Sequence, residues 1–279
     1  MPPVAVIDPG DVVLFETGDS AYERLSAGES VEAIGLETFN AVTGPVAVRG
    51  AEPGDALRIE VLEISIDRAW AVRMPDFGPL GVGIEDIEVR EVVVADGKAI
   101  LSPRLAVPLR PMIGCIGVCP DGEPGSTFEP AYPWGGNMDL RELSPGAILY
   151  LPVQVPGALL CLGDLHAAMG TGEPTWVALE SAGQAVVTVG LEKGLRLECP
   201  RLRIGTETLF VVALEKHEHL EAAQERAVRI AHQYLTDTFG LDAFEAYSYC
   251  CACLEIRFGG PASPIVVAVV PDPIIAISD

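Results

Sequence analysis

Positive charge is scarce in this sequence. The 279 residues include 18 lysines and arginines against 40 aspartates and glutamates, which gives a formal net charge of −22 at pH 7. A surface of this sign repels the phosphates of nucleic acids and the headgroups of anionic membranes. We therefore expect neither nucleic acid nor a membrane as a binding partner.

Several motifs of common enzymes are missing. Lysine occurs only at Lys98, Lys193 and Lys216. None of the three lies in a serine- and glycine-rich motif, which argues against a Ser-Ser-Lys amidase, and none is placed for the Glu-Lys-Cys set of a nitrilase. The sequence also lacks a Gly-x-Ser-x-Gly elbow, a phosphate-binding loop and a dinucleotide-binding fingerprint.

Export and membrane signals are not visible either. The N-terminus has no basic segment followed by an apolar core, so we expect no signal peptide. Residues 143–163 carry no charge, but Pro152, Gln154 and Pro156 interrupt them, which predicts two buried strands around a turn and not a membrane span. The cysteines number seven and lack the paired spacing of a zinc site, so we expect buried or idle reduced thiols and a cytoplasmic protein.

The composition favours strands. Hydrophobic residues make up 49% of the sequence, enough for a substantial core, and 29 glycines and 23 prolines punctuate it. This mixture is typical of many short strands joined by turns. We expect a mainly β protein with β-sandwich or barrel-like sheets and a small α+β C-terminal portion that contains one long and one short helix.

The pattern divides the chain into a β-rich core, residues 1–214, and a helical and strand portion packed on it, residues 215–279. Residues 67–100 are expected to leave the core as an excursion. Leu57, Ile59 and Val61 alternate with charged residues, as in a half-buried strand. The expected strands lie at residues 12–15, 44–49, 56–66, 88–94, 99–101, 107–119, 175–179, 185–189, 196–199, 209–214, 254–258 and 265–270.

Two helices are expected near the C-terminus. Apolar residues recur at spacings of three and four over residues 215–239, and Gly240 is a suitable stop. Asp242 and Glu245 form the signature of a capping box, which predicts the start of a second, shorter helix.

Polar side chains gather at both ends of one apolar stretch. Asn137 and Asp139 follow a glycine pair, which suits a tight turn at the end of a strand. Asp164, His166 and Glu173 lie among several glycines, which predicts a loop. Because Asp164 and His166 are two residues apart, an extended chain would point both to the same side. Such a group can present oxygen and nitrogen atoms to one metal ion or one substrate.

Each part of this pattern also has a simpler interpretation. Asn and Asp after a glycine pair are often turn formers, and a histidine beside an aspartate is often a surface hydrogen-bonded pair. Glu16 and Asp19, which follow the first strand, can equally be a solvated strand end. The combination is harder to explain in this way, because scaffolds usually place sites on glycine-rich loops at the ends of apolar strands.

An oxygen-rich set with one imidazole suits metal-assisted hydrolysis. Asp139, Asp164 and His166 can hold a divalent metal, and zinc is the natural choice for mixed nitrogen and oxygen ligands. Such an ion lowers the pKa of bound water to about 7 in favourable sites and polarises a carbonyl. Glu173 would take the proton of the water and pass it to the leaving group, while Asn137 or the backbone amides of residues 135–136 would steady the oxyanion. The spacing does not name the substrate.

These motifs resemble those of the acetamidase/formamidase family. The resemblance covers nearly the whole chain and is carried by residues 43–46, 50–55, 111–114, 116–118, 135–139, 149–153, 155–159 and 163–173. It implies a mostly β, homo-oligomeric enzyme that hydrolyses short amides to a carboxylate and ammonia, with a metal associated with the fold. We expect this metal to be zinc, with calcium as the alternative. The candidate site residues that carry over are Asn137, Asp139, Asp164, His166 and Glu173, with Asp19 as a weaker candidate metal ligand.

The resemblance leaves two alternatives open. Some relatives look like lactam hydrolases, so a γ-lactam or another cyclic amide is one alternative substrate. A non-catalytic β-rich binding protein that kept the fold is the other, although the intact set of acids and histidine favours an enzyme. Met169 and Thr171 stand where the family pattern has glutamine and aspartate, and residues 120–134 depart from it, which predicts an altered pocket.

Overall fold

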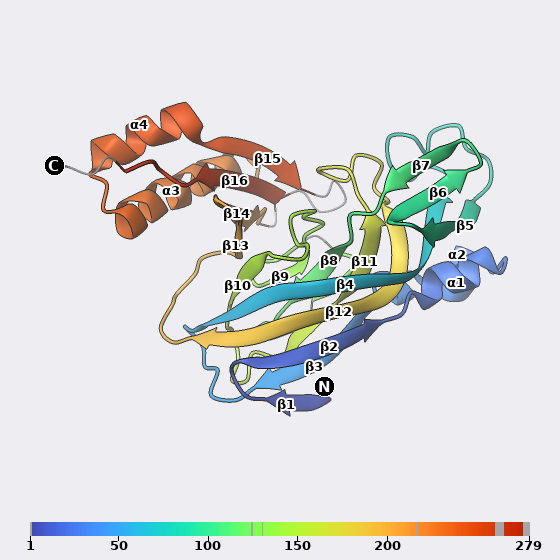
Figure 1. Ribbon diagram of the computed structural model, residues 1–279, viewed down its shortest axis with the longest axis horizontal. Helices are drawn as coiled ribbons and strands as arrows, with labels where there is room; N and C mark the ends of the chain where they lie inside the picture. Colours follow the sequence, from blue (N-terminus) through green and yellow to red (C-terminus); the bar gives the residue numbers. More distant parts are fainter. Residues whose placement is uncertain (1, 124, 130, 216, 260–264, 276–279) are drawn as a thin grey trace.

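The protein is mainly β, as the composition predicts. The computed structural model describes residues 2–123, 125–129, 131–215, 217–259 and 265–275. Figure 1 shows long strands across the middle of the molecule, two helices at one end, and short strands with small helices at the other. The strands of the described residues join into one hydrogen-bonded network of sixteen.

The elements follow one another along the chain with strands in the large majority. The strands are β1 Ala5–Ile7, β2 Asp11–Thr17, β3 Val42–Val48, β4 Ala56–Arg73, β5 Glu88–Ala95, β6 Lys98–Ser102, β7 Leu105–Pro108, β8 Met112–Gly117, β9 Gly135–Asn137, β10 Ile148–Pro152, β11 Leu160–Ala168, β12 Leu179–Glu192, β13 Arg201–Ile204, β14 Glu207–Ala213, β15 Glu255–Gly259 and β16 Ile265–Pro271. The helices are α1 Ser20–Ser26, α2 Val31–Ile34, the 3₁₀ turn η1 Leu36–Thr38, α3 Leu220–Phe239 and α4 Ala243–Cys253.

The middle of the network is antiparallel. β12 pairs with β4 along all of its 14 residues, and it also pairs with β11 and β2. β11 pairs in turn with β3 and β8. Strands from distant parts of the sequence therefore meet on β11, which carries Asp164 and His166.

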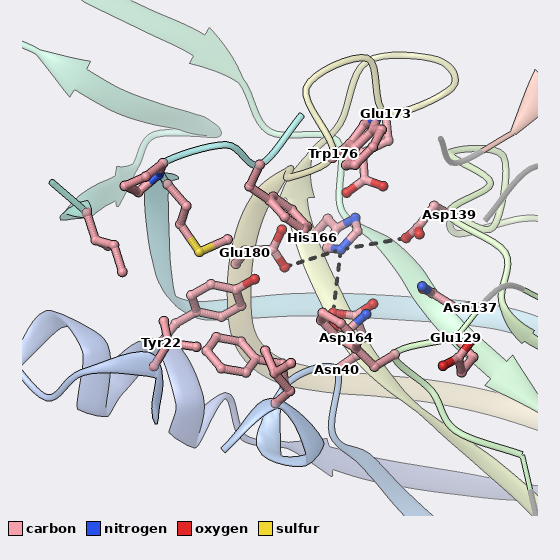
Figure 2. Close-up of a pocket in the computed structure, with 18 of the residues that line it drawn as sticks. Tyr22, Asn40, Glu129, Asn137, Asp139, Asp164, His166, Glu173, Trp176 and Glu180 are labelled. Atoms are coloured by element: carbon pink, nitrogen blue, oxygen red, sulfur yellow. Dashed lines mark ion pairs between the residues drawn. The ribbon is translucent and has the colours of Figure 1, made fainter. Parts of the chain in front are cut away.

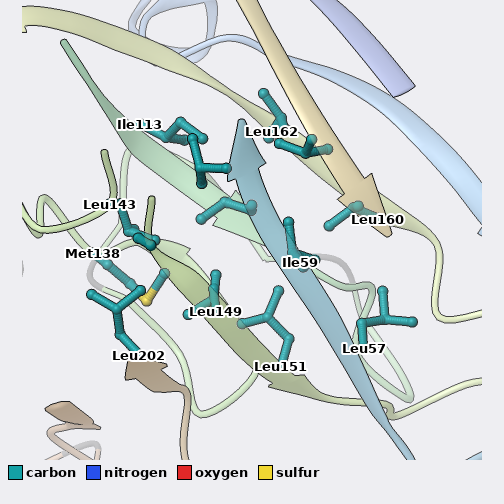
Figure 3. Packing of buried hydrophobic residues seen from close by; sticks show 14 of the residues in the cluster. Leu57, Ile59, Ile113, Met138, Leu143, Leu149, Leu151, Leu160, Leu162 and Leu202 are labelled. Carbon is teal, nitrogen blue, oxygen red and sulfur yellow. The ribbon is translucent and has the colours of Figure 1, made fainter. Parts of the chain in front are cut away.

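The main core is built from strands whose apolar residues alternate. Leu57 and Ile59 of β4 are fully buried, as the alternation predicts, and they pair in register with Leu151 and Leu149 of β10. Figure 3 shows these four side chains packed among other leucines and isoleucines. Burying one such side chain stabilises the fold by about 1.5–3 kcal/mol. The prediction of two strands within residues 143–163 is confirmed, because β10 and the start of β11 occupy this segment.

Helix α3 covers the part of the sheet formed by β14 and β16. The helix ends at Gly240, whose φ of 67° is left-handed, and α4 begins with a capping box of Asp242 and Glu245, both as predicted. Among the described helices, none has the length and apolar character needed to cross a membrane. The buried residues of α3 recur every four positions and are small except for the last: Ala223, Ala227, Ala231 and Leu235. The division of the chain at residue 214 stays a prediction.

Two predicted boundaries are wrong. Residues 67–73 belong to β4 and not to an excursion, because this end of β4 pairs with both β12 and β5 and buries Trp70. Strands β5 to β7 do lie off the main path of the network, and Asp96 and Gly97 form the predicted hairpin turn between β5 and β6. Helix α3 begins at residue 220 and not at 215, because His217 has a left-handed φ of 68° that a helix cannot contain.

Two of the expected strands are not formed. Residues 175–178 are a loop, in which Trp176 has a left-handed φ of 64° that breaks an extended chain. Residues 196–199 are also irregular, and β13 begins only after Pro200, which has no N–H to give to a strand ladder. The single strand expected at residues 107–119 is divided into β7 and β8.

Candidate active site

Four buried acidic side chains, Asp139, Asp164, Glu173 and Glu180, cluster with one histidine in a single cavity (Figure 2). Asp164 and His166 come from β11, so the prediction of a loop at these two residues is wrong: β11 continues to Ala168 because β8 and β12 hold it on both sides. The two side chains enter the same cavity, as their spacing predicts. Glu173 comes from the loop after β11, and Asp139 lies just beyond the end of β9.

The imidazole of His166 lies among three carboxylates without a short contact to any of them. Its Nε2 atom is 3.4 Å from Glu180 Oε2, 3.6 Å from Asp164 Oδ1 and 3.9 Å from Asp139 Oδ1. Good N–H···O hydrogen bonds are about 2.7–3.2 Å long. Figure 2 shows the three carboxylates converging on this nitrogen from different sides. The space between these groups is therefore of the kind that a small cation fills.

The buried position of the cluster shifts its proton equilibria. Burial raises the pKa of Glu173 to about 9, and the charge of Asp139 adds to this shift. Burial also raises the pKa of Asp139 to about 7, although His166 opposes the change. Burial alone would lower the pKa of His166, but Glu180 and Asp164 hold it well above its usual value. Negative charge thus exceeds positive charge here, and the site favours protons or a cation as compensation.

The donor atoms of the cluster fit a divalent metal ion. Two sets of three residues each bring their donor atoms within 4.8 Å of one another: Asp139, His166 and Glu173 form one, and Asp164, His166 and Glu180 the other. In the part of the chain that is described, Asp139 Oδ1 and His166 Nδ1 are buried without a hydrogen-bond partner, which is unusual for buried polar atoms. Imidazole nitrogen with carboxylate oxygen suits zinc, whereas calcium prefers oxygen ligands alone.

A glycine makes room for two of the carboxylates. A Cβ atom on Gly114 of β8 would lie 2.6 Å from Asp164 Oδ2 and 2.9 Å from Asp139 Oδ1. These distances are too short for any real side chain, so only glycine lets the two carboxylates approach this strand.

The two remaining predicted residues differ in their relation to the cluster. Asn137 lines the cavity, and its Oδ1 accepts a hydrogen bond of 3.1 Å from the thiol of Cys115. Asp19 is buried, but its carboxylate caps α1 by accepting from the backbone N–H of Tyr22, and it belongs to neither set of donor atoms. Burial and the charge of Glu180 raise the pKa of Asp19 to about 8. A role for Asp19 as a metal ligand stays a prediction.

Sequence reasoning missed Glu180 and Cys115. Glu180 reaches the site because it pairs with His166 across β11 and β12, and no motif marks that register. Cys115, expected to be buried or idle, is indeed buried, but its thiol also contacts Asp164 Oδ2 at 3.3 Å. Burial raises the pKa of this thiol well above its usual value, so it remains a hydrogen-bond donor. The available signal for Glu180 was an acidic residue at the start of a strand whose next charged residue is Glu192.

This mainly β protein with a buried carboxylate and histidine cluster matches one family over almost its full length. The model of the acetamidase/formamidase family matches residues 1–127 and 122–275. The chain therefore belongs to the acetamidase/formamidase family. The crystal structure of an acetamidase from Bacillus halodurans is similar to it with a TM-score of 0.88 and 32% sequence identity, covering 97% of this chain and 92% of that one.

Two further relatives are more distant. A formamidase from Methylophilus methylotrophus is 26% identical over 69% of this chain. The match spans 62% of that formamidase, so this chain covers less than two thirds of its length. A γ-lactamase from Delftia acidovorans is similar with a TM-score of 0.65 at 23% identity, over 97% of this chain and 86% of that one, which shows a common fold alone.

Proposed function

We propose that this protein hydrolyses the C–N bond of a small linear amide and releases a carboxylate and ammonia. The observation that carries the proposal is the buried cluster around His166, because water-activating chemistry needs such a set of acids and imidazole in one cavity. The names of the acetamidase and formamidase relatives support the substrate class.

His166, Asp164 and Glu180, with Asp139 beside them, are the residues that would hold a divalent metal, zinc by the chemistry of the donors. Such an ion supplies Lewis acidity, which polarises a carbonyl group and acidifies water. The single imidazole favours one nitrogen-liganded ion per chain.

Glu173 acts as the general base in this proposal. It lies in the cavity beside Asp139 and His166, where positive charge would favour its ionised form. Its carboxylate takes a proton from the attacking water and gives one to the departing nitrogen, so that ammonia leaves as the C–N bond breaks.

Asn137 is the proposed partner of the oxyanion. The thiol of Cys115 fixes the oxygen side of its amide, and Figure 2 shows its nitrogen directed toward the cluster. A pre-positioned N–H donor of this kind stabilises charge that develops on a carbonyl oxygen. The backbone amides of Gly135 and Gly136 are the alternative donors.

The proposal also covers the oligomeric state and the location of the protein. The chain works as a homo-oligomer, and it resides in a reducing compartment, the cytoplasm. All seven cysteines are unpaired, which supports such a compartment.

The proposal is tested by ammonia release from formamide, acetamide and propionamide, and by the γ-amino acid formed when a γ-lactam ring is opened. The protein is assayed as purified, after treatment with a chelator, and after zinc is added back. Release from a linear amide that the chelator removes and zinc restores supports a metal-assisted amidase. Release that chelation does not change removes the metal from the mechanism. Faster ring opening of the γ-lactam than hydrolysis of any linear amide would assign the cyclic alternative, and no turnover of any of the four compounds by a folded protein would favour a binding protein.

A further inference from the structure

The cavity next to the cluster is larger than a short amide requires. Its volume is about 630 Å³, in the middle of the range of about 300–1,000 Å³ that holds ligands of drug size. Acetamide is only a methyl group on a carboxamide. Bound at the cluster, it would leave most of the cavity to water, and the apolar walls would contribute nothing to its recognition.

Aromatic rings form two separate parts of the wall. Tyr22 and Phe39 meet edge to face with ring centroids 5.3 Å apart. Phe77 and Trp176 form a second edge-to-face pair at 5.7 Å. All four line the cavity. Figure 2 shows Tyr22 and Trp176 on different sides of the cluster, so an apolar group bound between the walls could contact rings of both pairs.

These walls come from segments other than the strands that carry the cluster. Tyr22 belongs to α1 and Phe39 directly follows η1, while Phe77 and Phe128 lie in loops after β4 and after β8. Met74, from the same loop as Phe77, adds a flexible side chain that adapts to irregular ligands. Most of the apolar wall thus lies apart from the polar cluster, while Trp176 shares the loop after β11 with Glu173. Loops often set specificity on a fixed scaffold in this way.

The acidic character of the cavity disfavours substrates that carry a negative charge. Among the described residues that line the cavity, none is lysine or arginine. Glu32 and Glu129 add acidic groups outside the cluster. A substrate that carries a carboxylate or phosphate besides its amide would lack any cationic side chain to pair with and would meet negative charge.

We propose that the preferred substrate is an uncharged primary amide whose acyl group carries an aromatic ring or an apolar group of similar size, with the amide at the His166 cluster and the ring between the aromatic walls. The inference rests on the proposed function and specifies its substrate. Water adds to the carbonyl carbon, the C–N bond breaks as the nitrogen takes up a proton, and ammonia and the carboxylate of the same acyl group result. The acidic lining then repels the carboxylate and favours its release.

Rates of ammonia release from four amides test this inference. The panel is formamide, acetamide, phenylacetamide and 4-carboxyphenylacetamide, each measured as kcat/KM with the full chain and its metal. Each carbon buried in an apolar pocket is worth about tenfold or more in kcat/KM. We therefore expect phenylacetamide to exceed acetamide by about 100-fold or more, and the carboxylated analogue to fall well below phenylacetamide.

The outcomes separate the inference from the function on which it rests. If acetamide or formamide equals or exceeds phenylacetamide, the substrate class is wrong and the amidase proposal stands. If the carboxylated analogue reacts as fast as phenylacetamide, the argument from charge is wrong. If no amide releases ammonia, the proposed function fails and the inference fails with it.

Variants of the aromatic walls test whether the ring of the substrate binds between them. Trp176→Ala, and separately Phe77→Ala, should lower the ratio of kcat/KM for phenylacetamide to that for acetamide by about tenfold, because each removes part of one aromatic pair. Leu105→Ala is the control, since this apolar side chain is 53% exposed on β7 and does not line the cavity. An unchanged ratio in both wall variants, with their fold checked by circular dichroism, would overturn the proposed position of the ring.

Discussion

At the scale of the single residue, three carboxylates of the site each depend on an unusual backbone conformation. Asp139, Asp164 and Glu173 have φ values of 42°, 55° and 42°, all in the left-handed region. Residues other than glycine adopt this region at a cost of about 1–3 kcal/mol each, and they concentrate at functional sites. The surrounding strands hold this conformation, and it aims the three side chains into one cavity (Figure 2).

The role of Glu180 tests the structure itself, because strand pairing and not a sequence motif places this residue in the site. Glu180→Gln removes a negative charge beside His166 Nε2. We expect metal affinity to fall by about tenfold or more, since even an outer partner of a ligand is worth about 10–100-fold. Metal content after dialysis measures it. Glu192→Gln, an exposed position on the same strand, is the control. Equal metal in both variants would remove Glu180 from the metal site.

Glu173 should behave differently from Glu180. Glu173→Gln keeps the shape of the side chain but removes its ability to accept a proton. We expect ammonia release to be lost while the fold and the bound metal are retained. Metal analysis, circular dichroism and the ammonia assay on the same preparation check this. Loss of metal together with activity would instead make Glu173 a ligand, and retained activity would remove it as the base.

At the scale of the element, β11 is the strand on which the site depends. Its neighbours β8 and β12 bring Cys115 and Glu180 beside the residues that β11 itself carries. β9 adds Asn137 through its pairing with Cys115. Each contact joins residues that are distant in sequence, so the site exists only when the registers of these strands are correct.

This dependence explains how much the sequence could predict. Alternation revealed β4 and β10, and capping signals revealed the start of α4, because these are local patterns. The motifs also placed Asp139, Asp164, His166 and Glu173 in one cavity. Strand register is set by pairing across the sheet, which no local pattern records, so Glu180 was missed. A left-handed residue in the loop after β11, Trp176, likewise left no pattern, and a strand was wrongly expected there.

Gly163 tests the packing of β11 against its neighbour. A Cβ atom at this position would lie 2.2 Å from the carbonyl oxygen of Ala41 and 2.8 Å from Cα of Val42. Gly163→Ala should therefore destabilise the fold by about 1–3 kcal/mol, the usual cost of overpacking. Denaturant unfolding measures it. Gly190→Ala on β12, where the nearest atom would be at 3.5 Å, should change the stability much less. Equal stability of both variants would show that β3 and β11 can separate freely.

At the scale of the whole molecule, one helix exposes an apolar face. Phe244 and Tyr247 of α4 are 78% and 62% exposed, and Cys251 is exposed beside them. Spacings of three and four place the three on one side of the helix. Exposed apolar surface of this kind is typical of interfaces between chains.

The predicted homo-oligomer can be tested through this face. We expect light scattering to give a mass that is a multiple of the chain mass. The double variant Phe244→Glu with Tyr247→Glu should lower that mass, because it would bury two charges in the interface. Leu105→Glu, on β7 at 53% exposure, is the control. A wild-type protein that is monomeric at all concentrations would contradict the prediction, and an unchanged mass of the double variant would move the interface elsewhere.

We propose that the cluster around His166 holds one metal ion and that amide hydrolysis requires this ion. The most direct test is to strip the protein with a chelator, titrate it with zinc, and measure bound zinc and ammonia release from acetamide and phenylacetamide at each step. We expect almost no release by the stripped protein and a linear rise that ends near one zinc per chain, with no such rise for His166→Ala. Full activity in the stripped protein, or restoration by zinc in His166→Ala, would contradict it.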